Sequence, residues 1–107
     1  MPDENQVEIP QSFIALFVDR GRLRSGATRE IVAARYELCD DTANMLTEHA
    51  ETMLFNLGIS ETEVLTRCHQ GLIADASVFS ELEAAWVIGR LAELLNWVLP
   101  DLGPVRS

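Results

Sequence analysis

The stretch from Thr28 to Leu57 contains neither proline nor glycine, and this constrains the fold more than any other feature of the sequence. Within it, apolar residues recur at alternating spacings of four and three, which is typical of a helix that buries one seam against a neighbour. The seam consists of Val32, Tyr36, Cys39, Ala43, Leu46, Ala50, Met53 and Leu57. Thr28 is a candidate N-cap, and Gly58 stands where a left-handed C-terminal cap belongs. We therefore predict one long helix between these two caps.

The predicted helix is too long for a small globule. It would extend about 45 Å at 1.5 Å per residue, whereas a compact monomer of this size corresponds to a sphere only about 34 Å across. Either the helix breaks near Asp40, Asp41 and Thr42, where capping residues cluster, or a second subunit covers the protruding seam. We expect a homodimer. Four further residues should broaden the apolar face enough for it to pack against more than one neighbour. They are Ile31, Leu38, Met45 and Leu54.

An acidic stripe runs along the opposite side of the same predicted helix. It consists of Glu37, Asp41, Asn44, Glu48 and Glu51, again spaced by four and three. We expect a solvated face, since outward positions of a helix are usually charged. The alternative is a docking site for a basic protein partner.

Two shorter helices are predicted from capping boxes, in which a serine and a glutamate three residues later satisfy each other's backbone amides. The boxes are Ser60 with Glu63 and Ser80 with Glu83. The first helix should end at Gly71, and the second should run from Leu82 to Leu99 and be closed by Pro100. An apolar block over residues 13–18 predicts a short helix, with a strand as the alternative. The fold class is therefore all-α, a small bundle of about four helices in a single domain over residues 1–107, with a flexible polar leader (1–9) and tail (101–107).

The last predicted helix carries an unusual strip. Trp86, Arg90, Glu93 and Trp97 follow one another at steps of four, three and four, so they should share one helical face. Tryptophan and arginine are enriched at binding hot spots, which makes the strip a candidate interaction surface. Alternatively, both indoles pack against the first and second helices while the charged pair reaches the rim.

The basic residues are few and all are arginine. The chain has eight of them and no lysine against 17 acidic residues, for a formal net charge of -9. A phosphate-binding loop with its lysine and a Schiff-base lysine are excluded, and general nucleic-acid binding is disfavoured by the negative field. Four arginines nevertheless gather around a glycine-containing segment that should form an exposed loop. They are a candidate anion-binding group, with pairing to the chain's own acids as the alternative: Arg20, Arg22, Arg24 and Arg29.

No pattern in the sequence predicts catalysis, a cofactor or a metal. Cys39, His49, Cys68 and His69 lack the short spacings of zinc ligands, and no catalytic triad is suggested. No apolar run approaches the length of a membrane span. The acidic start, Met1 to Glu4, and two cysteines without a framework pattern predict a cytoplasmic protein with reduced thiols.

Four stretches of the sequence carry a resemblance to known proteins: Ile9-Pro10 with Ser12 to Val18, Ala33 to Cys39, Leu46 to Ala50 and Glu83 to Val87. They resemble a family of small helical proteobacterial proteins often labelled ATPase with chaperone activity, and the likeness runs over most of the chain. The resemblance implies an accessory role beside an ATP-dependent chaperone and brings with it no residue of known role.

Taken together, these patterns predict a non-enzymatic interaction or adaptor protein that forms a homodimer and presents helical faces to a protein partner. The partner is left open, and neither nucleic acid nor a membrane is expected. The alternative is an ATP-linked chaperone component, or a binder of a small anionic ligand that uses the arginine loop.

Overall fold

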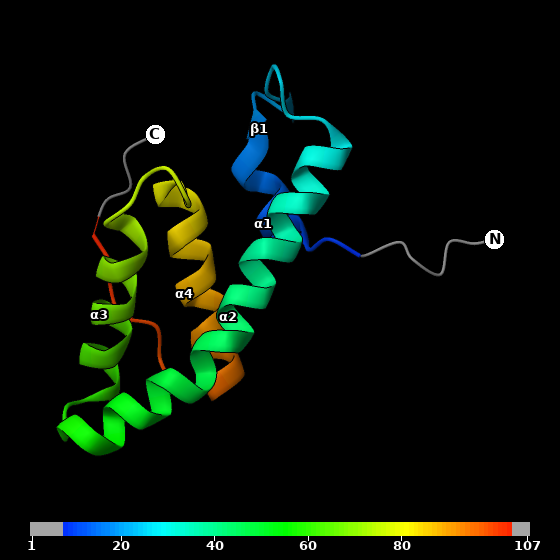
Figure 1. Cartoon of the computed structure of the whole chain (residues 1–107). Coiled ribbons are helices and arrows are strands. Elements are labelled where there is room, and N and C mark those ends of the chain that lie inside the picture. Colours follow the sequence, from blue (N-terminus) through cyan, green and yellow to red (C-terminus); the bar gives the residue numbers. More distant parts are fainter. Residues whose placement is uncertain (1–7, 104–107) are drawn as a thin grey trace. The chain divides into compact units, whose positions relative to one another are not determined.

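A computed structural model describes residues 8–103 and shows a mostly helical chain (Figure 1). Its elements are α1 (Gln11–Ile14), the 3₁₀ turn η1 (Ala15–Phe17), β1 (Val18–Asp19), β2 (Arg22–Leu23), α2 (Arg29–Leu57), α3 (Glu61–Ile73) and α4 (Glu81–Leu95). The predicted all-α class with four helices, one of them long, is confirmed. The chain divides into two compact units, one up to Leu38 and one from Cys39, and α2 contributes to both. Most of the predicted flexible leader and tail, residues 1–7 and 104–107, lies outside the described residues.

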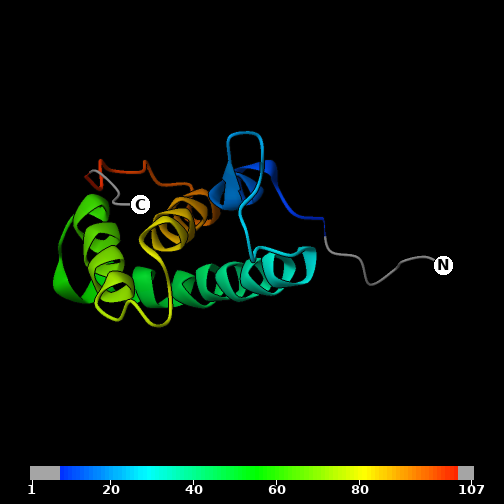
Figure 2. The same cartoon turned by 90° about the horizontal axis from the view of Figure 1, so that it is seen from above.

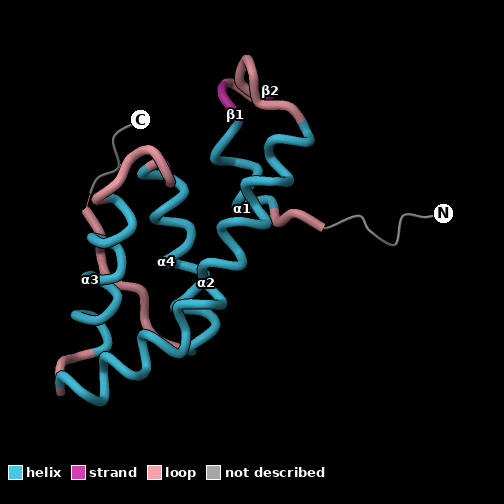
Figure 3. Tube along the Cα trace, in the orientation of Figure 1, coloured by secondary structure: helices cyan, strands magenta, loops and turns pink. Residues whose placement is uncertain are grey.

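Before α2, the first unit contains a single turn of helix, the 3₁₀ turn and a hairpin (Figure 3). The apolar block that predicted either a helix or a strand forms α1, then η1, then β1. Phe13 is fully buried, with its ring 5.4 Å from that of Phe17 and 5.5 Å from that of Tyr36. Strands β1 and β2 pair antiparallel, with Val18 opposite Leu23. The segment predicted as an exposed loop is therefore partly a hairpin, although all of residues 20–26 are exposed as expected.

Helix α2 has the two caps that the sequence predicts. The Ile31 N–H donates to Thr28 Oγ1 at 3.2 Å. At the other end, Gly58 adopts a φ of 63° and its N–H donates to the Leu54 carbonyl at 3.1 Å. The helix is unbroken between these caps, so the alternative of a break near Asp40 is not realised.

The predicted seam of α2 is buried over most of its length. Cys39, Ala43 and Ala50 are fully buried, and of the eight seam residues only Leu57 is exposed. Of the four residues expected to broaden the apolar face, Leu54 packs against the core cluster, whereas Ile31, Leu38 and Met45 are exposed in the single chain. The buried stripe is thus narrower than the apolar stripe in the sequence.

The second unit is built on the packing of α3 along α4 and of both against α2 (Figures 1 and 2). Its fully or nearly buried cluster consists of Ala50, Val64, Leu65, Cys68, Ile88, Leu91 and Ala92. Leu46, Met53 and Leu54 of α2 pack against this cluster from the edge. Among the helices of residues 8–103, none combines the length and apolar character that crossing a bilayer requires.

The two predicted capping boxes differ in the structure. Ser80 Oγ accepts the Glu83 N–H at 3.0 Å, and the Glu83 carboxylate accepts the Ser80 N–H at 2.9 Å, which completes the box at the start of α4. At the start of α3, Ser60 Oγ accepts the Glu63 N–H at 3.0 Å. The Glu63 carboxylate instead pairs with Arg67 one turn further on, at 3.0 Å, so only half of this box forms.

Helix α3 passes its predicted end. It continues through Gly71 to Ile73, and Leu72 packs against the core cluster. A glycine in a helix costs only about 1 kcal/mol relative to alanine. Burial of the following leucine can offset this cost, so the helix continues through Gly71.

Helix α4 stops earlier than predicted, at Leu95 and not at Leu99. Asn96 takes the left-handed conformation with a φ of 61°. The Asn96 N–H donates to the Glu93 carbonyl at 3.1 Å, and the Trp97 N–H donates to the Ala92 carbonyl at 2.8 Å, which together form a Schellman motif. The chain then turns back towards α3 (Figure 2), and Trp97 and Leu102 pack against the core cluster.

The left-handed Asn96 gives a direct test of this helix end. We expect Asn96→Ala to lower the free energy of unfolding by about 1 kcal/mol, because a Cβ-bearing residue without a polar side chain is strained there. Asn96→Gly should be neutral or stabilising. Urea unfolding followed by circular dichroism measures both.

The matched control for this pair is Asn56→Ala, at an exposed position inside α2. Alanine is the better helix former there, so the control should not lose stability. Equal destabilisation by Asn96→Ala and Asn96→Gly would contradict the assigned helix end.

Candidate functional site

The strip predicted from Trp86 to Trp97 does not form one helical face. Because α4 ends at Leu95, Trp97 lies beyond the helix and packs back on the core cluster of the second unit. Trp86 is half-buried within α4. Both indoles are therefore partly covered by the fold.

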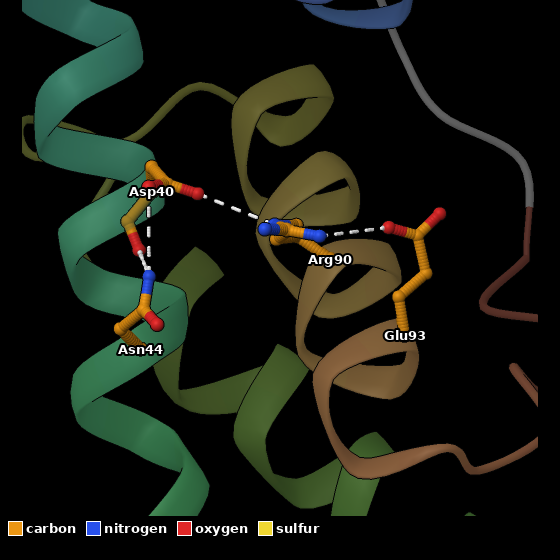
Figure 4. Close-up of polar contacts among 4 residues, drawn as sticks. All are labelled: Asp40, Asn44, Arg90 and Glu93. Carbon is orange, nitrogen blue, oxygen red and sulfur yellow. Dashed lines mark hydrogen bonds and ion pairs between the residues drawn. The ribbon is translucent and has the colours of Figure 1, made fainter.

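Arg90 is held in an ion-pair network between α2 and α4 (Figure 4). Its Nε donates to Asp40 Oδ1 at 3.3 Å, and its Nη1 donates to Glu93 Oε1 at 3.3 Å. Asn44 Nδ2 donates to the Asp40 backbone oxygen at 2.8 Å and to Asp40 Oδ2 at 3.5 Å. Partial burial acts to lower the pKa of Arg90, but the hydrogen bonds and charges of Asp40 and Glu93 outweigh it and raise the pKa above its ordinary value. Arg90 thus ties two helices together.

Asp40 is the member of this network that sequence reasoning missed. It lies 50 residues before Arg90, and its position beside Asp41 indicated only a possible helix break. A sequence pattern on one helix cannot show which residue of another helix it faces. No pattern in the sequence predicts the contact between Asp40 and Arg90.

We expect Arg90→Gln to lower the free energy of unfolding by about 0.5 kcal/mol, since the Arg90 side chain is more than a third exposed and solvent screens its pairs. The double-mutant cycle with Asp40→Asn should return a coupling of similar size that shrinks at 1 M salt. Denaturant unfolding measures each variant.

The control is Arg67→Gln, which removes an ion pair within α3 whose side chains are both about half exposed. Its cost should be smaller, a few tenths of a kcal/mol. A coupling of zero between Arg90 and Asp40 would show that the network does not stabilise the fold.

The four candidate anion-binding arginines divide into different environments. Arg20 and Gly21 form the hairpin turn with φ values of 56° and 84°, the positive pair typical of a type I′ turn. Arg24 Nη2 donates to the Leu16 carbonyl at 2.8 Å, which ties the hairpin to η1. Arg22 and Arg29 line a groove of about 710 Å³ within the first unit. None of the four makes an ion pair to another residue of the described range, so the predicted pairing with the chain's own acids is not seen there.

The acidic stripe of α2 is solvent-exposed along its whole length, as expected of an outward face. The structure adds two apolar side chains to that side of the helix in the second unit. Met45 is 70% exposed and Phe55 is 87% exposed. Sequence reasoning placed Met45 with the buried residues and passed over Phe55. The spacing of Asp41, Met45, Glu48, Thr52 and Phe55, which alternates between four and three, could have identified a second face.

The two thiols are both free and buried. Burial raises the pKa of the Cys68 thiol, which disfavours the nucleophilic thiolate. Within residues 8–103, no three side chains of the metal-binding types lie close enough together to hold an ion. Cys39 and Cys68 therefore serve as small apolar residues in the packed interior.

Comparison of the chain with protein-family models, with curated proteins and with solved structures found no significant match.

Proposed function

We propose that this chain is a non-enzymatic interaction protein that docks a basic protein partner on the outer face of α2. The outer face is defined by Asp41, Met45, Glu48, Thr52 and Phe55, all exposed and all in the second unit. The observation that carries the proposal is the exposure of Met45 and Phe55 on a helix whose other side is already buried. Large apolar side chains left in water are anchors for a partner.

The charge of the outer face selects the partner's chemistry. Asp41 and Glu48 lie on it and Glu51 lies beside it, with no basic residue among them. Met45 and Phe55 are ten residues apart, which places them about 15 Å apart along the helix axis. A partner helix with two apolar anchors at a similar separation and lysine or arginine around them would complement both features.

A second copy of this chain is a poor occupant for the outer face. An isologous contact would bring the same carboxylates together, and juxtaposed like charges are costly. The preferred occupant is therefore a basic amphipathic segment of another protein.

The test uses a labelled 18-residue leucine and lysine peptide that forms an amphipathic helix. Fluorescence anisotropy with the full chain should show binding that weakens as salt rises, because charge pairs contribute. Replacing both anchors, Met45→Ser with Phe55→Ser, should weaken binding at least tenfold. The double variant Glu48→Gln with Glu51→Gln should make the affinity for the peptide less dependent on salt.

Two controls accompany this measurement. Glu61→Gln removes one exposed carboxylate outside the outer face and should leave the affinity unchanged. A peptide with glutamate in place of lysine should not bind. Unchanged affinity of the anchor variant, or equal binding of the acidic peptide, would refute the proposed face.

We also propose a homodimer, which a different observation supports. Leu94, Val98 and Leu99 are exposed at the end of α4, with Val98 82% exposed, and no charged residue occurs from 94 to 100. An uncharged apolar patch can meet its own copy without repulsion. The seam of α2, which first suggested a dimer, is mostly buried within the chain and so does not supply this interface.

Sedimentation at micromolar concentration should give twice the monomer mass for the native chain. Val98→Glu with Leu99→Glu should give the monomer mass, since each carboxylate would face its copy. The anchor variant, Met45→Ser with Phe55→Ser, should remain dimeric and is the matched control. A monomeric native chain would remove the dimer proposal and leave the docking face standing.

The cytoplasmic location and the chaperone-linked role remain proposals. Two buried, unlinked thiols suit a reducing compartment. A docking face for basic segments is compatible with an accessory subunit beside a larger machine, as the resemblance to the chaperone-labelled family implies.

A further inference from the structure

The first unit contains a groove of about 710 Å³ that the proposed function does not use. Its apolar lining comes from the segment before α1, from α1, from both hairpin strands and from α2: Ile9, Ile14, Val18, Leu23, Val32 and Ala33. Val18 and Leu23 are opposite each other in the hairpin and both are exposed. The volume is within the range of grooves that bind small organic ligands.

Two arginines at this groove have no ion-pair partner among the described residues. Arg22 is on β2 and Arg29 is the first residue of α2. A cation in the first turn of a helix is disfavoured by the helix dipole, so Arg29 does not serve the stability of α2. Guanidinium groups that border an apolar surface are suited to a carboxylate, sulfate or phosphate on an otherwise apolar molecule.

Three carboxylates at the same groove limit which anionic ligands can bind there. Glu8, Glu30 and Glu37 also line it, so its acids outnumber its arginines. A polyanion such as ATP or inorganic phosphate would gain two cations but face three repulsive charges and leave the apolar lining uncovered. A ligand with one negative charge and an apolar body satisfies the arginines and the lining together.

We propose that this groove binds one molecule of a single-chain amphiphile with a monoanionic headgroup. The apolar chain lies over Val18, Leu23 and Val32, and the headgroup is held by Arg22 and Arg29. Arg24, through its bond to the Leu16 carbonyl, holds the hairpin against η1 and so preserves the wall of the groove. The inference is independent of the docking face on α2.

The probe is dodecanoate, kept below the concentration at which it forms micelles and titrated into the full chain in a calorimeter. We expect one site per chain with micromolar affinity. Arg22→Gln with Arg29→Gln should weaken binding about tenfold or more, because both charge-assisted contacts to the headgroup are lost. Ala33→Leu, which adds bulk to the groove at a helical position that tolerates leucine, should weaken it as well.

Arg20→Gln is the control for the single variant Arg22→Gln, since each removes one positive charge from the hairpin and Arg20 does not line the groove. The Arg20→Gln variant should bind dodecanoate with the affinity of the native chain. Circular dichroism melts should show that all variants fold, and dodecyltrimethylammonium, with the same chain and a positive head, should bind at least tenfold more weakly.

Several outcomes would overturn the proposal. Equal affinity in the Arg22/Arg29 variant and in Arg20→Gln would show that the arginines hold no headgroup. Equal binding of the cationic amphiphile would show apolar adsorption only. Stronger binding of ATP than of dodecanoate would make this a polyanion site, and no heat of binding with dodecanoate would show that the groove does not hold a monoanionic amphiphile.

Discussion

The burial of small residues along one side of α2 is the constraint on which the second unit depends. Cys39, Ala43 and Ala50 have no exposed surface, and Ala50 belongs to the same cluster as Leu65 of α3 and Leu91 of α4. Small side chains let neighbouring backbones approach closely, so the cluster is filled by leucine, isoleucine and valine from the shorter helices. A larger residue at Ala50 would have no space without moving a helix.

The narrowness of this buried stripe decides what is left on the surface. A broad apolar stripe would have required more of α2 to be covered, and Met45 would then lie in the interior. In the structure the stripe ends at the edge residues Leu46 and Met53, so Met45 and Phe55 remain in water. The exposed apolar residues of the second unit are thus a consequence of how its core is packed. They are the reason why we propose a role in binding other molecules.

Local signals in the sequence predicted local structure well. Thr28, Gly58, Ser60 and Ser80 all cap helices as expected, because a cap depends on residues within one turn of it. The predicted helix ends at Gly71 and Pro100 were wrong for two different physical reasons. Glycine permits a helix end but does not require one, and a left-handed asparagine at 96 ended α4 before the proline could.

The site residues were harder to predict, since their surroundings depend on contacts between elements. The spacing of Trp86, Arg90, Glu93 and Trp97 was read correctly, but the early end of α4 removes Trp97 from the shared face. Arg90 finds Asp40 on another helix, which no periodicity indicates.

The uneven distribution of charge gives the two proposed binding surfaces different chemistry. Two arginines without an ion pair among residues 8–103 occur at the groove of the first unit, whereas the outer face of α2 in the second unit carries carboxylates around Met45 and Phe55. In both proposals the apolar area supplies affinity, while the two arginines of the groove and the carboxylates of the outer face would select the sign of the ligand's charge. The net charge of -9 adds to this selection between ligands of different charge. The negative electrostatic field of the whole chain repels an approaching anion, so local arginines must hold the anion against that field. For the groove we therefore propose a monoanion with a large apolar body over a polyanion, and for the outer face a basic protein segment, which the same field would attract.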